Sequence, residues 1–220
     1  AKFFFKRNYW LDIRDLWPDS VYELGQIKKG FLLKLSKKLE KKIYESAEGF
    51  IFPVPGFRRY LKSFSSIVAN KPMYELMNGV SKDFINKYMS LKTSSAKSFT
   101  VLYSGNMGLA QDLETIVKAA EILKDYNINF TFIGEGVCKQ KIISLAGSLV
   151  TKINFHNPMP RQELIESINN ASVCVVPLKD RKLFYSALPS KIFEYMACER
   201  PVIIGIKGEA KKMIKEANAG

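Results

Sequence analysis

Short apolar runs alternate with amphipathic segments throughout the second half of the chain. Each run is rich in Val, Ile, Leu or Phe, is followed by a loop or turn, and precedes apolar positions at helical spacing. Such alternation is typical of a parallel sheet with helices on both faces. We therefore predict five strand–helix units. Their strands are expected at residues 99–104, 129–133, 152–156, 172–176 and 201–206.

The loops after these strands are candidate ligand contacts, because ligands of open parallel sheets bind at the carboxyl ends of the strands. The first loop reads GNMG, the second GEG and the third NPMP, while LPSK precedes the helix after the fourth strand. Glycine in such loops lets the backbone approach a ligand closely. The candidates in and just after the first two loops are Gly105, Asn106, Gly108, Gln111, Gly134, Glu135 and Gly136.

The first half of the chain is less regular. Its predicted strands are residues 9–14, 50–54 and 72–77. No glycine-rich turn introduces them, although a doubly wound domain usually begins with one, so we expect the front of this domain to be missing. The polar segment 91–98 has no periodicity and is predicted to be a linker. The expected domains are residues 1–92 and 98–220.

Composition argues against several classes of protein. The 220 residues contain one histidine, His156, and three cysteines without paired spacing. We therefore expect no metal site, no disulfide framework and no cofactor. No G-x-G-x-x-G opens a first strand, which argues against an NAD-dependent dehydrogenase. The longest apolar runs, VCVV and VIIGI, are too short to cross a bilayer, and no leader pattern follows Ala1.

Positive charge is concentrated in the first half of the chain. The net charge is +13, and residues 1–97 hold 19 Lys and Arg against 9 Asp and Glu. Within Lys28–Lys42, seven lysines and one glutamate surround leucines at helical spacing. Such a helix fits an anionic membrane surface. The alternative is a surface helix whose leucines face the core. Nucleic acid is not expected, because no recognition pattern accompanies the charge.

The most informative stretch is SALPSKIFEYMACERPV, residues 186–202. If Ser190 caps the helix that begins there, the N–H groups of the first turn point outward and favour an anion. Lys191 adds a full positive charge, and Glu194 lies on the same helical face three positions later. A diphosphate beside Ser190 and Lys191, with a sugar hydroxyl on Glu194, suits a nucleotide-sugar. The alternative is an ordinary capped helix with a Lys–Glu surface pair.

Arg14 and Asp15 are candidates in the first half. They lie where a predicted strand gives way to a loop, and Asp12 shares a strand face with Arg14. A guanidinium beside a carboxylate could bind a donor or acceptor phosphate in a cleft between the domains. The alternative is a structural ion pair at the end of a strand.

Five segments in this order resemble the family-4 glycosyltransferases of the two-domain GT-B fold. They are IRDLWPDS, MNGVSKDF, YSGNMGLAQDLETIVKAAEIL, FIGEG and LPSKIFEYMACERPVI. The resemblance spans nearly the whole chain and is closest to the bacterial branch that builds O-antigen, capsule and related polysaccharides. It implies an α/β protein of two Rossmann-like domains with parallel sheets, the N-terminal one incomplete, and a C-terminal domain that binds the nucleotide-sugar.

The resemblance also implies roles for individual residues. Glu194 matches the glutamate expected to hold the ribose hydroxyls, Ser190 and Lys191 match residues near the diphosphate, and GNMG matches the turn facing the phosphates. Arg14 and Asp15 stand where many members have His-Asp, and are the catalytic candidates. The chain departs from the family at three places, with Ser186 for the first motif glutamate, Asn106 and Gln111 for an arginine and a lysine, and Arg14 for the histidine.

The implied reaction is transfer of a sugar from a nucleotide-sugar donor, usually a UDP-sugar, with retention at the anomeric carbon and without a metal ion. The expected partners are a lipid-linked or saccharide acceptor and, through Lys28–Lys42, an anionic membrane surface. The expected location is the cytoplasmic face of the cell membrane, and this stretch alone is expected to be inactive. Two alternatives remain open at this stage, a GT-B nucleotide-sugar epimerase and a non-catalytic basic protein that binds membranes or nucleic acid.

Overall fold

The computed structural model describes residues 7–88, 98–147 and 152–220. They form two compact units, and the chain passes from the first to the second after Asn78. The segment Arg181–Leu188 returns to the first unit. Apart from Ser98, the predicted linker lies outside the described residues, so the expected domain limits stay a prediction. No helix in the described ranges combines the length and the apolarity that crossing a membrane requires.

The first unit contains a three-stranded parallel sheet in the order β1-β2-β3. Its strands are β1 (Trp10–Asp12), β2 (Gly49–Phe52) and β3 (Met73–Glu75), close to the predicted positions. Its helices are α2 (Asp19–Glu23), α3 (Phe31–Ser46), α4 (Pro55–Phe64) and α5 (Ser66–Ala69). The central strand carries the core, because Phe50 and Phe52 are fully buried and the ring of Tyr44 packs on Phe50 and Phe64.

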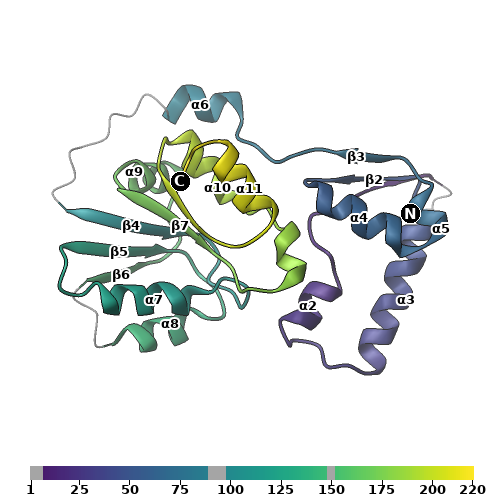
Figure 1. The fold of residues 1–220 in the computed structure, drawn as a ribbon, viewed down its shortest axis with the longest axis horizontal. Coiled ribbons are helices and arrows are strands. Elements are labelled where there is room, and N and C mark those ends of the chain that lie inside the picture. The colour runs from purple at the N-terminus through teal and green to yellow at the C-terminus, as the bar shows by residue number, and fades with distance from the viewer. Residues whose placement is uncertain (1–6, 89–97, 148–151) are drawn as a thin grey trace. The chain divides into compact units, whose positions relative to one another are not determined.

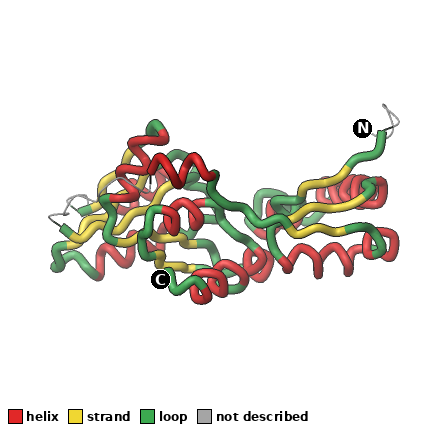
Figure 2. The backbone as a smooth tube through the Cα atoms, turned by 90° about the horizontal axis from the view of Figure 1, so that it is seen from above, coloured by secondary structure: helices red, strands yellow, loops and turns green. Residues whose placement is uncertain are grey.

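The second unit contains a five-stranded parallel sheet in the order β6-β5-β4-β7-β8. Its strands are β4 (Phe99–Ser104), β5 (Ile128–Ile133), β6 (Ile153–His156), β7 (Val173–Pro177) and β8 (Val202–Gly205), which confirms all five predicted strands. Every residue of β7 is buried, as expected of an inner strand covered on both faces. In Figure 2 the strands of each sheet lie side by side with helices packed around them.

Helices cover both faces of this second sheet. They are α7 (Leu113–Ile122), α8 (Lys139–Ala146), α9 (Arg161–Asn169), α10 (Lys191–Ala197) and α11 (Glu209–Glu216). Figure 1 shows α7 and α8 on one side of the sheet, with α10 and α11 on the other. Within this sheet the first strand in the sequence is the central strand β4. The next two strands, β5 and β6, add on one side of β4, and then β7 and β8 add on the other side. The order of the strands therefore reverses between β4 and β7, where ligands of such sheets bind.

Three short elements, α5 among them, were absent from the sequence prediction. The other two are helix α6 (Lys82–Tyr88) and the 3₁₀-helix η2 (Lys182–Ser186), which lies in the expected loop after β7. Helix α6 has a recognisable start, because the hydroxyl of Ser81 accepts a hydrogen bond from the N–H of Phe84 at 3.1 Å. The sequence carries this capping signal, but seven residues are too few for a clear helical period.

Candidate functional site

The first two glycine loops of the second unit lock together through their backbones. The N–H of Gly105 donates to the carbonyl of Ile133 at 2.9 Å, and the N–H of Met107 donates to the carbonyl of Glu135 at 2.7 Å. Glycine is required at position 134, where φ is +147° and a Cβ atom would lie 2.0 Å from the Gly105 carbonyl oxygen. The predicted contact loops are therefore one continuous surface at the ends of β4 and β5.

Lys191 reaches this surface from the first turn of α10. Its Nζ lies 2.9 Å from the point that a Cβ atom of Gly105 would occupy, and 3.8 Å from the centre of the Tyr103 ring. Loss of water around the half-buried ammonium lowers the pKa of Lys191 to about 7, although the Glu194 carboxylate opposes the shift. Among the described residues the structure shows no ion pair for Lys191. The amine of Lys191 therefore lies over the glycine surface, where an incoming anion would stabilise its charged form.

Tyr195 fixes the position of α10 against β4. Its hydroxyl accepts a hydrogen bond from the N–H of Ser104 at 2.9 Å and lies 2.9 Å from the Ser104 hydroxyl. Both side chains are buried, with Tyr195 fully so. The buried positions of α10 are Ile192 and Tyr195. This contact sets where Lys191, one turn earlier, meets the glycine loops.

The start of α10 differs from the prediction. Ser190 precedes the first helical residue, but its side chain makes no capping hydrogen bond and its backbone is already helical. The N–H groups of Ile192 and Phe193 donate to the carbonyls of Pro189 and Ser190, each at 3.1 Å. A capping residue usually has extended backbone angles, which leave these donors free. The expected cap is therefore wrong, and two of the N–H groups expected to face an anion are already used.

Glu194 has a different partner from the one the alternative interpretation expects. Its carboxylate accepts a hydrogen bond from the guanidinium of Arg161 at 2.8 Å, whereas no bond to Lys191 is present. The guanidinium of Arg161 also lies over the ring of Phe84, 5.1 Å from its centre. Glu194 keeps 23% of its side chain exposed. Its carboxylate is oriented by Arg161 and still has oxygen surface for a ligand hydroxyl.

The buried Lys139 connects the second loop to the third. Its Nζ donates to the Gly134 carbonyl at 3.0 Å, to Glu135 Oε2 at 2.9 Å and to Asn157 Oδ1 at 2.6 Å. The hydrogen bond from Lys139 lowers the pKa of the exposed Glu135 carboxyl. The predicted contact residue Glu135 is therefore held in place by its hydrogen bond from Lys139. Gly136 continues the loop beside Met107.

Asn106, Gly108 and Gln111 form the first loop itself. The amide oxygen of Gln111 accepts a hydrogen bond from the N–H of Gly108 at 3.1 Å, which closes the turn. The carbonyl of Asn106 accepts a hydrogen bond from the Tyr103 hydroxyl at 2.6 Å. Gln111 thus shapes the loop through its side-chain oxygen.

Arg14 and Asp15 belong to the first unit, whereas all other predicted site residues belong to the second. The guanidinium of Arg14 donates to Asp12 Oδ2 at 2.7 Å and to the side-chain oxygen of Asn78. Asp15 instead accepts a hydrogen bond from the Ser20 hydroxyl at 2.9 Å. Arg14 lies beyond the end of β1, where it forms an ion pair with Asp12, and Arg14 and Asp15 are held by separate partners.

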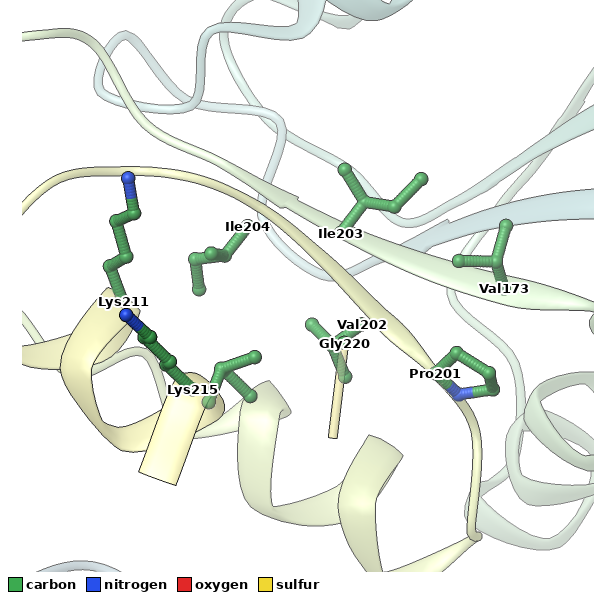
Figure 3. Close-up of a pocket in the computed structure, with 9 residues that line it drawn as sticks. Val173, Pro201, Val202, Ile203, Ile204, Lys211, Lys215 and Gly220 are labelled. Atoms are coloured by element: carbon green, nitrogen blue, oxygen red, sulfur yellow. The ribbon is translucent and has the colours of Figure 1, made fainter. Parts of the chain in front are cut away.

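A separate apolar cavity of about 460 Å³ lies along the edge strand β8 (Figure 3). It is lined by Val173, Pro201, Val202, Ile203, Ile204, Lys211, Ile214, Lys215 and Gly220. None of the predicted site residues is among them. The chemistry expected of a diphosphate site is instead found at the glycine loops and Lys191.

The sequence pattern of the family described as "Glycosyl transferases group 1" matches residues 86–220, more than half of the chain. The chain belongs to this family. Over 222 aligned residues it is 22% identical to a Pseudomonas aeruginosa protein named as a glycosyltransferase, WbjE, which covers 94% of this chain. Over 97 residues, 44% of this chain, it is 27% identical to WcaI of Escherichia coli K12, named as a glycosyl transferase of colanic acid biosynthesis. The chain spans 54% and 24% of these two relatives.

Solved structures of glycosyltransferases share the fold. The structure of Anabaena HepE in complex with UDP and glucose has a TM-score of 0.71 at 13% identity, covering 96% of this chain and 56% of HepE. WaaG, described as a glycosyltransferase involved in lipopolysaccharide biosynthesis, has a TM-score of 0.66 at 16% identity, covering 95% of this chain and 59% of WaaG. These likenesses confirm the predicted α/β fold of the GT-B type with parallel sheets.

Four side chains that organise this glycosyltransferase-family site were missed in the sequence analysis. They are Tyr103, Lys139, Arg161 and Tyr195. Each acts on a residue distant in the chain, as Arg161 does on Glu194 and Tyr195 on Ser104. Tyr195 carried a weak signal, because a tyrosine three positions after a buried isoleucine falls on the same helical face. No local signal identifies Lys139. Lysine is usually found at the surface, but this side chain is buried, with only 6% of its area exposed.

Proposed function

We propose that this protein is a glycosyltransferase of surface polysaccharide biosynthesis that moves a sugar from a UDP-sugar to a lipid-linked or saccharide acceptor. The observation that carries the proposal is the half-buried cation of Lys191 over the interlocked glycine loops. Family membership supports the reaction class. The presence of UDP and glucose in the HepE structure supports the donor class.

The donor is proposed to bind with its diphosphate at Lys191 and Gly105, and with its ribose hydroxyls on Glu194. The side chains of Lys191 and Glu194 are one turn apart on α10, so both ends of a nucleoside diphosphate find a partner on one short helix. Arg161 orients the Glu194 carboxylate through their 2.8 Å hydrogen bond. We propose that the loop residues Asn106 and Glu135, and Ser190 at the start of α10, also contact the bound donor.

The reaction requires stabilisation of the charge on the departing diphosphate. The bond between the anomeric carbon and the phosphate oxygen breaks and the diphosphate keeps the electron pair. The acceptor oxygen forms the new bond to the anomeric carbon, and its proton passes to the departing diphosphate. Retention without a metal ion, which the family resemblance implies, assigns this stabilisation to Lys191 and to backbone N–H groups. Arg14 and Asp15, which follow the end of β1, stay proposed as the catalytic candidates.

The proposed location is the cytoplasmic face of the cell membrane, where a lipid-linked acceptor is within reach. The support for this part is the concentration of positive charge in Lys28–Lys42. Binding of the donor and binding of the membrane use different units of the chain, so each can be tested separately.

UDP binding tests the donor site. Ligand at about 100 times its dissociation constant stabilises a protein by about 2.7 kcal/mol, so UDP is expected to raise the melting temperature. We expect this rise to persist in EDTA and to be largely lost in Lys191→Met. The matched control is Lys118→Met, which removes an exposed lysine of α7.

Two outcomes count against the proposal. Loss of the UDP effect in EDTA would overturn metal independence. A full UDP effect in Lys191→Met would remove Lys191 from the donor site, and with it the observation on which the proposed function rests.

A further inference from the structure

Helix α3 packs into the first unit with its polar face inward. Its buried residues are Ser36, Glu40 and Tyr44, which follow one another at intervals of one turn. An amphipathic helix of a soluble domain normally buries its apolar stripe and exposes its polar one. The alternative raised from the sequence, a surface helix whose leucines face the core, is therefore wrong for Leu32, Leu35 and Leu39.

Four large apolar residues of α3 lie on its exposed face, whereas Leu33 and Ile43 are half-buried. Phe31 is 81% exposed, Leu32 59%, Leu35 50% and Leu39 49%. At 100° per residue these four side chains fall within one continuous strip along the helix, which we name the α3 stripe. Isolated exposed leucines are ordinary, but a contiguous strip of four large apolar side chains marks a surface that is covered by something else.

A buried polar network holds the helix in this orientation. Glu40 is 2% exposed, accepts a hydrogen bond from the Tyr60 hydroxyl at 2.9 Å and pairs with Lys37 at 3.2 Å. Lys37 also pairs with Asp19 of α2 at 2.6 Å. Burial raises the pKa of Glu40, while Tyr60 and Lys37 oppose the shift. Rotating α3 to bury the leucines would break all these bonds. The buried polar network therefore keeps the α3 stripe exposed.

Lysines run beside the stripe at the same spacing. Lys34, Lys38 and Lys42 recur every four residues, one position before Leu35, Leu39 and Ile43, and all three are exposed. An apolar strip flanked by a row of cations matches a bilayer with anionic headgroups, where the leucines enter the interface and the lysines meet phosphates. A second copy of the chain fits less well, because a symmetric contact would bring two lysine rows together.

The geometry points to α3 as an interfacial helix through which the protein lies on an anionic lipid bilayer. Phe31, Leu32, Leu35 and Leu39 enter the boundary between headgroups and acyl chains, and the lysine row binds lipid phosphates. This inference deepens the proposed function, since a lipid-linked acceptor is presented at such a surface. It needs neither donor nor transfer, so either idea can fail alone.

Co-sedimentation with vesicles tests the inference. The 220-residue chain is expected to bind mixed phosphatidylcholine–phosphatidylglycerol vesicles and to bind phosphatidylcholine vesicles far more weakly. Lys34→Gln/Lys38→Gln is expected to weaken binding by about 20- to 30-fold, since each lysine near an anionic surface contributes about fivefold. Leu35→Gln/Leu39→Gln is expected to weaken it at least about tenfold, because the stripe no longer enters the interface.

Matched controls distinguish binding through α3 from a general effect of losing positive charge or exposed apolar side chains. Lys211→Gln/Lys215→Gln removes two exposed lysines with the same spacing from α11, and Ile122→Gln removes an isolated exposed apolar side chain from α7. Both controls are expected to bind like the parent. Equal losses in the α3 and α11 lysine variants, or unchanged binding by Leu35→Gln/Leu39→Gln, would overturn the inference. A dimer in light scattering that Leu35→Gln/Leu39→Gln dissociates, without vesicle binding by the parent, would also overturn it.

Discussion

Lys191 combines a candidate function with a stability cost. Its ammonium is half-buried against the Tyr103 ring and Gly105, and in the fold its pKa falls to about 7 from an ordinary value of 10.5. Between these two pH values the unfolded chain holds a proton that the folded chain has released. Stability therefore rises with pH across this window, and the charged form is the one that the fold disfavours.

Lys191→Met is accordingly expected to stabilise the protein in the absence of ligand. The gain should be on the order of 1 kcal/mol or more at and below pH 7 and should shrink as pH rises toward 10.5. Urea denaturation of the parent and the variant across this window measures the difference. A gain that does not change with pH would show that Lys191 titrates as it does in the unfolded chain.

At the scale of elements, the site depends on how α10 is docked on β4. The helix has only seven residues, so its position comes from packing rather than from its own propensity. The Tyr195 hydroxyl provides the specific bond, because it satisfies the buried N–H of Ser104. The glycine loops provide the complementary surface, since side chains at Gly134 and Gly136 would collide with the first loop.

Tyr195→Phe tests this docking. The variant leaves the Ser104 N–H buried without its acceptor, which typically costs about 1–3 kcal/mol. We expect lower stability in urea together with weaker UDP binding, whereas Tyr126→Phe, at an exposed position of the same unit, should change neither. If the Tyr195 variant kept the stability of the parent, its hydroxyl would not be what fixes α10.

Across the whole molecule, charge and chemistry are divided between the two units. Most of the net charge of +13 lies in residues 1–97, where the α3 lysines are exposed, while the candidate donor site uses a half-buried lysine of the second unit. Salt screens exposed charges far more than partly buried ones. The two kinds of binding should therefore respond differently to ionic strength.

Raising the salt concentration is expected to weaken vesicle binding much more than UDP binding. The screening length falls from about 8 Å at about 0.15 M to about 3 Å at about 1 M, so vesicle binding should fall at least about tenfold. UDP affinity, measured by calorimetry at the same two salt concentrations, should change by less than about threefold because its cation is sheltered. A parallel loss of both would mean that UDP is bound by exposed surface charge.

The parallel sheet of the second unit and the positions of its glycine loops could be predicted from the order of residues alone. Hydrophobic periodicity and loop composition are local properties of the chain, so they can be read without knowing which distant residues make contact. The strand face predicted for Asp12 and Arg14 was less secure, because β1 ends at Asp12 and Arg14 lies beyond it.

Which distant side chains meet could be seen only in the folded chain. The folded chain paired Glu194 with Arg161, placed Tyr195 on Ser104, and used up two of the first-turn N–H groups that were expected to face an anion. It also turned the leucines of α3 outward, because the buried bonds of Glu40 with Tyr60 and Lys37 outweigh the pattern of the helix itself. Such contacts join residues distant in the chain, and their energies depend on burial that no local pattern records.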